Sequence, residues 1–435
     1  MSLTTPGPAW DTSGYQQVVD MLRRQVTDRL AADGAQQLSP ADRDARVARL
    51  VDEALDGYTR QRLQARQLPL DPPVEAQVAQ AVRDALTGLG PLTPLLADPT
   101  ITNIFVTGST VWVTRTDGSK DRLPPIVASS QALIDLIRDI AARAGTDERR
   151  FDRGLPRVSI RLPDGSRLFA TMAVSRHPSV SIRRFTLLNA SLDDLCLKHH
   201  AMDPGLRDLF TAMVLARKNI IICGGAATGK TTVLRGFAKA IPPTERLITI
   251  EDVFELGLDE DPDHPDCVAL QAREPNVEGQ GGVDQAELVR WALRMSPDRV
   301  ILGEARGGEV VPLLNCMSQG NDGSLATIHT SNSKQAFAKL MTYAAQSAER
   351  LSFEATAMLV AGAVDFVVHL TWSRDGVRVV SSVREVLHAD GREISSNEVF
   401  KPGPDRRAIP ATPIRTDTLD ELVEAGFNPD TIRGW

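Results

Sequence analysis

Short apolar runs alternate with amphipathic, helix-like segments through residues 189–400. The runs are rich in Ile, Val and Leu, as buried strands are, and they read NIIIC, LITIE, RVILGE, LATIHT and DFVVHL. Strands that alternate with helices are typical of an α/β domain with a mainly parallel sheet. We therefore expect such a domain over these residues, followed by a peripheral C-terminal tail over residues 401–435.

The chain before this domain has a different pattern. Apolar residues recur at helical spacing on a polar background, which predicts a helical N-terminal extension over residues 1–70. Residues 71–188 mix signals: ITNIFVTGSTVWVTRTDGS predicts two strands, QALIDLIRDIAARAG a helix, and PRVSIRLPDGSRLFATMAV a hairpin. We expect an α+β N-terminal domain there, with SVSIRRF as the start of a connector to the α/β domain.

Composition narrows the class of protein. The 435 residues suffice for about two or three domains. No apolar run approaches the roughly 18 residues of a membrane span, and the first residues lack a secretion signal, so we expect a cytoplasmic protein. A net charge of −7 argues against nucleic acid as the main partner. Cysteines without a CxxC pair predict reduced, buried thiols; they are Cys196, Cys223, Cys267 and Cys316.

The stretch GGAATGKTT carries the strongest chemical signal. It has the G-x-x-x-x-G-K-T spacing of a phosphate-binding loop, between an apolar strand and a helical pattern. The glycines let the backbone N–H groups and the helix N-terminus face an anion. We expect Lys230 to reach the β- and γ-phosphates of ATP and Thr231 to ligate Mg²⁺. The expected nucleotide-binding residues are Gly224, Gly225, Ala226, Ala227, Thr228, Gly229, Lys230, Thr231 and Thr232.

Polar side chains also end three of the predicted strands. Glu251 and Asp252 end LITIED, Glu304 ends RVILGE, and His329 follows LATI. In an open α/β sheet the ligand lies at the carboxyl ends of the strands, so these groups converge on the edge that carries the loop. A nucleotide hydrolase needs a carboxylate that polarises water and groups that sense the γ-phosphate. Taken singly, each acidic residue reads better as a cap or a solvated side chain.

Four ordered motifs together resemble one protein family. GGAATGKTT, TIEDVFEL, ALRMSPDRVILGEARGGE and GNDGSLATIHTSNS resemble those of the type II/type IV secretion superfamily ATPases. Within that superfamily the chain looks most like the CpaF/TadA-type branch, which drives tight-adherence pili. GLGPLTPLLADPTITNIFVTG and RLPDGSRLFA resemble its N-terminal domain, so the similarity runs from roughly residue 75 to 400. The resemblance implies a RecA-like P-loop domain and an ATP-hydrolysing motor.

The resemblance also implies roles for individual residues. Glu304 takes the place of the Walker B carboxylate that orients water. Glu251 and Glu255 belong to the acidic box near Mg²⁺, with Glu251 as a metal ligand, and His329 to the histidine box.

Arginines of the N-terminal domain are further candidates for phosphate contact. They are Arg183 or Arg184 in SVSIRRF and Arg161 or Arg167 in the preceding hairpin. The triphosphate needs cations that arrive only when the two domains close on it. The sequence leaves the choice among these arginines open.

The chain departs from the family pattern at a few positions. Ala227 stands where family loops usually carry glycine, Asn321 replaces a common histidine, and Ser296 replaces a usual arginine. The third motif reads GEARG where valine is usual before the arginine. Because Lys230 and Glu304 are retained, we expect an active but slow enzyme.

The sequence therefore predicts a cytoplasmic ATPase motor, a homo-oligomer that the resemblance implies is a hexamer. It would act on inner-membrane platform proteins at the inner face of the cell membrane to assemble pili or secrete protein. The alternatives are the motor of a conjugation or effector-secretion system, a RecA-like DNA translocase, and a nucleotide-binding scaffold without hydrolysis. The acidic balance counts against the translocase, and Glu304 against the scaffold.

Overall fold

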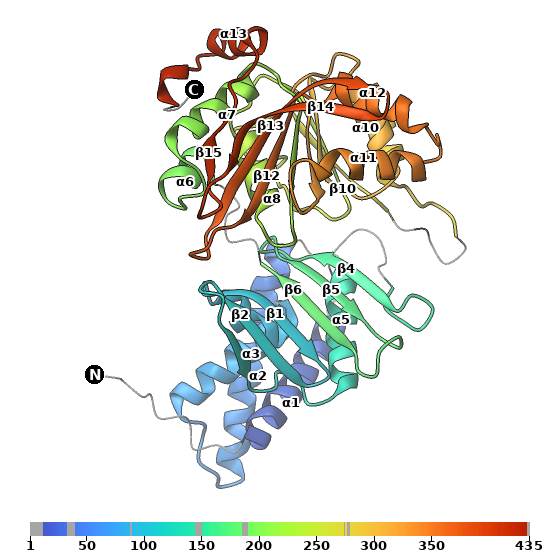
Figure 1. The fold of residues 1–435 in the computed structure, drawn as a ribbon. Coiled ribbons are helices and arrows are strands. Elements are labelled where there is room, and N and C mark those ends of the chain that lie inside the picture. Colours follow the sequence, from blue (N-terminus) through green and yellow to red (C-terminus); the bar gives the residue numbers. More distant parts are fainter. Residues whose placement is uncertain are drawn as a thin grey trace. The chain divides into compact units, whose positions relative to one another are not determined.

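The computed structural model divides the chain into two compact units, Met1–Arg184 and Phe185–Trp435 (Figure 1). It describes residues 12–32, 40–87, 89–143, 150–184, 190–273, 275 and 279–432. The predicted domain boundary at residues 188 and 189 lies outside these ranges. Within the described ranges, none of the helices combines the length and the apolar character that a bilayer-spanning segment needs.

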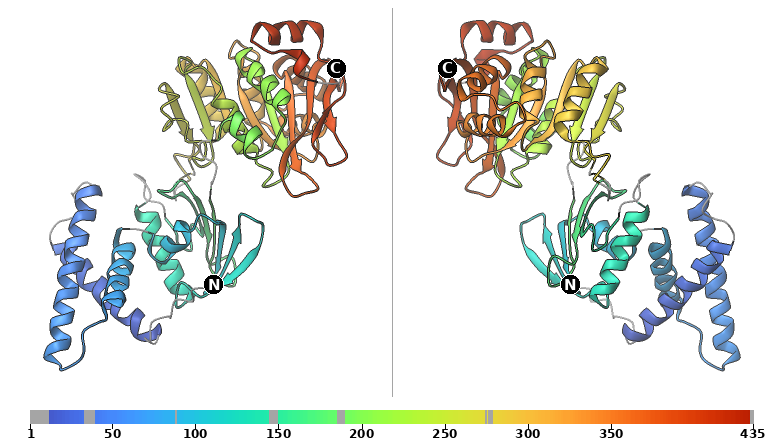
Figure 2. Two further views of the ribbon diagram at one scale, coloured as in Figure 1. Left: turned by 90° about the vertical axis from the view of Figure 1, so that its left-hand side faces the viewer. Right: turned by 90° about the vertical axis from the view of Figure 1, so that its right-hand side faces the viewer.

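Unit 1 begins with three helices that form their own core. They are α1 (Thr12–Ala32), α2 (Pro40–Gln64) and α3 (Pro72–Thr87). Leu22, Val26, Leu50 and Val82 are buried between them, and Figure 2 shows the three helices side by side. The sequence pattern predicted the first two helices but not α3, which begins with two prolines. Proline is compatible with the first turn of a helix, because those N–H groups have no intrahelical partner.

The rest of unit 1 is a six-stranded antiparallel sheet of order β3-β2-β1-β6-β5-β4. Its strands are β1 (Ile101–Thr107), β2 (Thr110–Arg115), β3 (Lys120–Leu123), β4 (Arg157–Arg161), β5 (Arg167–Thr171) and β6 (Ser179–Arg183). The helix α5 (Ser130–Arg143) packs on one face through Leu133 and Ile137. The short helices η2 (Gly90–Leu92) and α4 (Thr93–Ala97) add Leu92 and Leu96 to the same core.

The first part of SVSIRRF, Ser179–Arg183, is not a connector, as we expected, but a central strand. It forms β6, which pairs with both β1 and β5. Val180 and Ile182 are buried while Ser181 and Arg183 between and after them are exposed, which is the two-residue period of a strand with one covered face. The sequence did not reveal this strand because the alternating run is short and is followed by charged residues.

Unit 2 is an α/β domain, as the sequence predicted, built on a nine-stranded sheet of order β15-β14-β13-β12-β7-β11-β10-β8-β9. Neighbouring strands from β12 through β9 are parallel, and the pairs from β12 to β15 are antiparallel. The strands are β7 (Ile220–Gly224), β8 (Leu247–Glu251), β9 (Cys267–Gln271), β10 (Arg299–Ala305), β11 (Leu325–His329), β12 (Phe366–Trp372), β13 (Arg378–Asp390), β14 (Glu393–Pro402) and β15 (Ala408–Pro410). The antiparallel end was not predicted.

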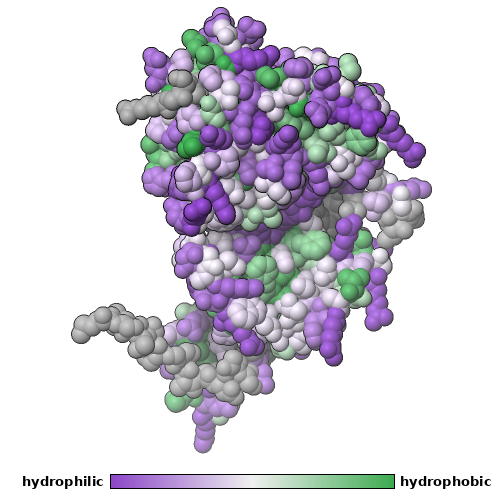
Figure 3. All heavy atoms as spheres, in the orientation of Figure 1, coloured by the Kyte–Doolittle hydropathy of each residue, from purple (hydrophilic) through white to green (hydrophobic). Residues whose placement is uncertain are grey.

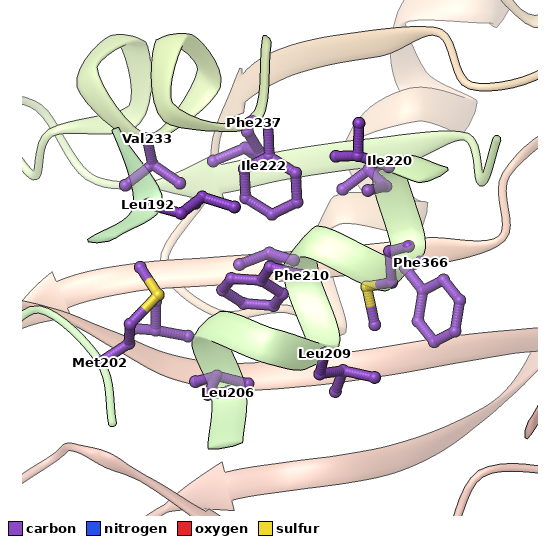
Figure 4. Close-up of a cluster of buried hydrophobic side chains, with 14 of the residues drawn as sticks. Leu192, Met202, Leu206, Leu209, Phe210, Ile220, Ile222, Val233, Phe237 and Phe366 are labelled. Atoms are coloured by element: carbon purple, nitrogen blue, oxygen red, sulfur yellow. The ribbon is translucent and has the colours of Figure 1, made fainter. Parts of the chain in front are cut away.

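Helices cover both faces of this sheet. On one face, the core cluster of Ile220 and Ile222 takes in α6 (Leu192–Leu197), α7 (Pro204–Leu215) and α8 (Lys230–Ala238). Figure 4 shows this cluster, in which the ring centroids of Phe210 and Phe237 lie 4.8 Å apart. The opposite cluster, around Ile221, takes in α9 (Gln285–Ala292), α10 (Val310–Met317), α11 (Gln335–Gln346) and α12 (Phe353–Ala363). Strand β7 is therefore buried on both faces, as its continuous apolar run indicates.

The C-terminal tail is not peripheral, as we expected, but part of the core of unit 2. It contains β15, the helix α13 (Thr416–Glu424) and the turn η4 (Pro429–Thr431). Leu422 and Phe427 are buried in the same cluster as Phe210 of α7. Their wide spacing in a polar segment gave no regular pattern, so the sequence concealed their role.

The cysteines agree in most respects with the prediction of reduced, buried thiols. The four cysteines are free thiols, and three are buried, but Cys267 is partly exposed. Burial raises the pKa of Cys223 to about 12, so this thiol is protonated and unreactive at neutral pH. Figure 3 shows hydrophilic side chains over most of the visible face of unit 2.

Candidate active site

The phosphate-binding loop joins β7 to α8. Its first glycine is enforced by close packing, because a Cβ at Gly224 would lie 2.6 Å from the carbonyl oxygen of Leu370. Gly229 caps the N-terminus of α8 with a φ of 92°, a backbone conformation that favours glycine. Between them Gly225, Ala226 and Ala227 are exposed. The loop therefore presents open backbone at a helix N-terminus, as an anion-binding site requires.

Ala227, the departure within the loop, has a left-handed backbone. Its φ is 59°, a region in which the Cβ of an L-residue is crowded by the following carbonyl group. This conformation explains why the family pattern has glycine at this position. The alanine costs about 1 kcal/mol in the folded loop.

Lys230 points back into the loop that it terminates. It is 7% exposed, and its Nζ donates to the carbonyl oxygens of Gly225 at 2.9 Å and Gly224 at 3.3 Å. The same Nζ lies 3.2 Å from Nδ1 of His329. Thr231 and Thr232 follow in the first turn of α8 and are partly exposed.

Glu304 lies at the centre of a chain of polar contacts next to the loop. Its Oε1 lies 2.7 Å from Nε2 of His329, and its Oε2 accepts a 2.6 Å hydrogen bond from Nη2 of Arg306. Arg306 also pairs with Asp252, which accepts a 2.9 Å bond from Nε2 of Gln285. The ends of β7, β11, β10 and β8 thus place Lys230, His329, Glu304 and Asp252 in one continuous network.

Glu251 lies beneath this network rather than in it. It is 3% exposed, and its Oε2 accepts hydrogen bonds from the N–H groups of Glu255 at 2.8 Å and Leu256 at 2.9 Å. Its Oε1 is buried without a hydrogen-bond partner among the described residues. Burial raises the pKa of Glu251 to about 7. A Cβ at Gly303 would lie 3.2 Å from its Cγ, so Glu251 packs against the residue before Glu304.

Glu255 contributes through its main chain. Its N–H holds Glu251, and its carbonyl oxygen accepts a hydrogen bond from Arg235, a buried residue of α8. The acidic segment after β8 is therefore tied to the helix that begins at the phosphate-binding loop.

These residues fit a nucleoside triphosphate with Mg²⁺. The exposed loop backbone and the Lys230 ammonium group supply positive potential for phosphate oxygens. The Thr231 hydroxyl lies in the first turn of the helix, where a P-loop holds its metal ion. The unpartnered Oε1 of Glu251 is a further oxygen donor of the kind that Mg²⁺ prefers.

Three of the candidate arginines form a row across the sheet of unit 1. Arg161 pairs with Arg167 across β4 and β5, and Arg167 pairs with Arg183 across β5 and β6. Directly opposite residues share one face of the sheet, so the three guanidinium groups stand on the same face.

Arg184 is placed differently. Its Nη1 donates to the carbonyl oxygen of Ile101 at 2.8 Å and to that of Asp98. Its side chain therefore ties the end of β6 to the segment that leads into β1. The structure separates this arginine from the row of three, a distinction that the sequence left open.

Arg306 is the site residue that we did not predict. It stands two residues after Glu304, inside the quoted GEARGGE motif, and it bridges Glu304 and Asp252. An arginine only two residues from a candidate catalytic carboxylate is a pattern from which this contact could have been predicted. At two further departures from the family pattern, Asn321 donates through Nδ2 to the carbonyl oxygen of Pro297 at 2.7 Å, and Ser296 has a left-handed backbone with a φ of 53°.

Comparison with known proteins agrees with this geometry. The family model described as "Type II/IV secretion system protein" matches residues 85–387. The chain is 35% identical over 322 residues to a putative conjugal transfer protein of Mycobacterium tuberculosis, covering 72% of this chain and 88% of that protein. It is 34% identical over 265 residues to VirB11 of Agrobacterium fabrum, covering 54% of this chain and 75% of that protein.

The fold has a counterpart among solved structures. The ATPase DotB of Legionella pneumophila matches with a TM-score of 0.50 and 18% sequence identity, over 69% of this chain and 80% of that one. At this identity the likeness concerns the fold.

Proposed function

Because this chain belongs to the family of type II/IV secretion system proteins, we propose that it is the ATP-hydrolysing motor of a secretion or pilus-assembly system. Its enzymatic activity is that of an ATPase. The observation that carries the proposal is the contact of His329 with both Lys230 of the phosphate-binding loop and Glu304.

The network supplies each function that hydrolysis needs. The loop backbone and Lys230 hold the phosphates, and the Glu304 carboxylate orients the attacking water by accepting its hydrogen bond. The Nζ of Lys230 lies 3.2 and 3.3 Å from the two ring nitrogens of His329, and Nε2 lies 2.7 Å from Oε1 of Glu304. With its proton on Nε2, the ring would donate to Glu304 and hold the carboxylate in place. Thr231 and the acidic box would hold Mg²⁺, which would supply positive charge to the phosphates of the bound nucleotide.

Coupling to motion would use the cations of unit 1. The transition state spreads charge over the γ-phosphoryl oxygens, and the loop covers one side of it. We propose that the row of Arg161, Arg167 and Arg183 supplies the cations for the other side of the γ-phosphoryl group. Binding energy would then close the two units and produce rigid-body movement. Head-to-tail contacts between such subunits close into a ring, which we propose is a hexamer.

The sequence motifs are the basis for proposing which secretion or pilus system this motor serves. We propose the CpaF/TadA-type, tight-adherence pilus branch, with inner-membrane platform proteins as partners and the cytoplasmic face of the membrane as the place of work. A second candidate is the motor of a conjugation or effector-secretion system, which the putative conjugal transfer relative favours. The two differ in cargo and not in chemistry. A RecA-like DNA translocase fits less well with a net charge of −7.

Hydrolysis by the purified chain tests this function. We expect Glu304→Gln to bind ATP with Mg²⁺ and to turn over at least about 100-fold more slowly than wild type. Glu393→Gln, an exposed glutamate on β14, is the matched control and should hydrolyse at the wild-type rate. A Glu304→Gln protein with normal turnover would refute the assignment of the water-orienting carboxylate. A several-fold rise in rate on adding DNA would favour the translocase.

A further inference from the structure

The hairpin of β12 and β13 carries an aromatic ring and a cation beside the phosphate-binding loop. Strand β12 runs parallel to β7 and pairs Leu370 with Gly224, so Trp372 extends past the start of the loop at the same sheet edge. Strand β13 returns antiparallel and pairs Arg378 with Trp372. The tip of this hairpin therefore stands at the end of the sheet where the nucleotide would bind.

Arg378 reaches the loop itself. Its Cδ lies 3.4 Å from the position that a Cβ would occupy on Gly229, the residue before Lys230. The Cζ of its guanidinium group lies 4.8 Å from the centroid of the Trp372 ring. The Arg378 side chain therefore lies between the Trp372 ring and the phosphate-binding loop at Gly229.

Both side chains lie on the side of the sheet that carries α8. Leu370 and Val380, two residues away from them along each strand, belong to the core cluster that contains Val233 of α8. Residues two apart in a strand share a face. Trp372 and Arg378 therefore flank the N-terminus of α8.

The backbone that carries the ring is well fixed. The turn is closed by the N–H of Ser373, which donates to the carbonyl oxygen of Val377 at 2.8 Å, and by the N–H of Val377, which donates to Ser373 Oγ at 2.9 Å. Nη1 of Arg406 donates to the carbonyl oxygen of Trp372 at 3.2 Å. Yet the Trp372 side chain remains 39% exposed. The fold thus holds an apolar ring in place without burying it.

We propose that Trp372 and Arg378 form a stacking platform for the purine ring of the bound nucleoside triphosphate. The proposal rests on the proposed function, since it requires the triphosphate to lie in the loop. An indole ring and a guanidinium plane both bind the flat face of a base. Because every base has such a face, stacking of this kind is tolerant of base identity. The platform would therefore serve ATP and GTP alike.

Binding measurements on ligands with and without a base test the platform. The ligands are ATP, GTP and inorganic tripolyphosphate, each with Mg²⁺, and the readout is the dissociation constant. We expect Trp372→Ala to weaken ATP and GTP by the same factor, on the order of 10-fold, and to leave tripolyphosphate unchanged. Trp372→Phe keeps an aromatic face and should restore most of the affinity. Trp291→Ala removes a comparably exposed ring from α9, 43% exposed, and should change nothing.

Arg378→Ala separates stacking from phosphate contact. If Arg378 stacks with the base, its loss weakens ATP and not tripolyphosphate. Weaker tripolyphosphate binding would instead place Arg378 on the phosphates and overturn its part in the platform. Arg374→Ala, an exposed arginine of the same hairpin, is the matched control.

Other results would refute the stacking platform or the proposed function on which it rests. Unchanged ATP affinity in Trp372→Ala, or an equal loss for tripolyphosphate, would refute contact between Trp372 and the base. A lowered unfolding midpoint would identify the pair as a structural contact of the hairpin. If wild type binds neither ATP nor tripolyphosphate, or if Lys230→Ala binds both normally, the proposed function fails and the platform fails with it.

Discussion

Nε2 of His329 lies 2.7 Å from Oε1 of Glu304. Together with the hydrogen bond from Arg306 to Oε2, this contact orients the Glu304 carboxylate. We expect His329→Ala to lower the turnover of ATP about 10- to 100-fold, because a small misplacement of a catalytic group is costly. Affinity for ATP should stay near that of wild type. Steady-state kinetics with separate binding measurements would check this, and His329→Gln, which can still donate to Glu304, should retain more activity than His329→Ala.

Lys230 is expected to be essential for binding. Its buried ammonium group donates to the loop carbonyls of Gly224 and Gly225 and is the cation that the loop offers to phosphate oxygens. Lys230→Ala should abolish measurable ATP binding by calorimetry. Near-normal affinity in a folded variant would count against the loop as the phosphate site.

Arg183 and Arg184 should give different phenotypes. Arg183 is exposed in the arginine row, so Arg183→Ala should cut turnover far more than ATP affinity or stability. Arg184 donates to main-chain carbonyls, so Arg184→Ala should lower the free energy of unfolding of unit 1 by about 2 kcal/mol. Chemical denaturation and kinetics on both variants would separate the roles. Equal losses of stability would show that the row is structural as well.

The stability of unit 2 should depend on the protonation of Glu251. Its pKa in the folded protein, about 7, lies above the ordinary value of 4.5, so the folded state binds the proton more tightly. Its contribution is fully present below about pH 4.5 and is lost as the pH rises through about 7, a change of about 3 kcal/mol. Urea denaturation at pH 5 and pH 8 would measure it. Glu251→Gln, which cannot ionise, should lack this part of the pH dependence.

The tail should contribute to the stability of unit 2. Leu422 is fully buried in the core cluster, whereas its neighbour Val423 is 46% exposed. Leu422→Ala should destabilise the unit by about 2–5 kcal/mol, and Val423→Ala by about 0.5 kcal/mol or less. Urea denaturation followed by tryptophan fluorescence would compare them. Similar midpoints for the two variants would contradict the assignment of the tail to the core.

The parts of the fold that local patterns determine were predictable. The strand before Gly224, the loop and the helix after it follow from a continuous apolar run, a glycine spacing and a helical period. The convergence of Glu304 and His329 followed from the rule that ligands lie at the carboxyl ends of parallel strands. These features need only nearby residues or a general rule of topology.

The parts that distant contacts determine were not predictable. Strand β6 is central because β1 and β5 flank it, and its own five residues do not reveal that. Arg184 differs from Arg183 because carbonyl groups far back in the chain accept its hydrogen bonds. The bridge from Arg306 to Asp252 likewise joins two strand ends that only the folded sheet brings together.

Because Leu422 and Phe427 belong to the same buried cluster as Phe210 of α7, this core of unit 2 cannot be completed early during synthesis. When α7 emerges from the ribosome, the residues that will bury its apolar face have not yet been translated. Chains grow at about 5–20 residues per second, so this surface stays open for many seconds. Exposed apolar surface of this kind promotes aggregation. This core is therefore complete only when the segment through Ile432 has docked.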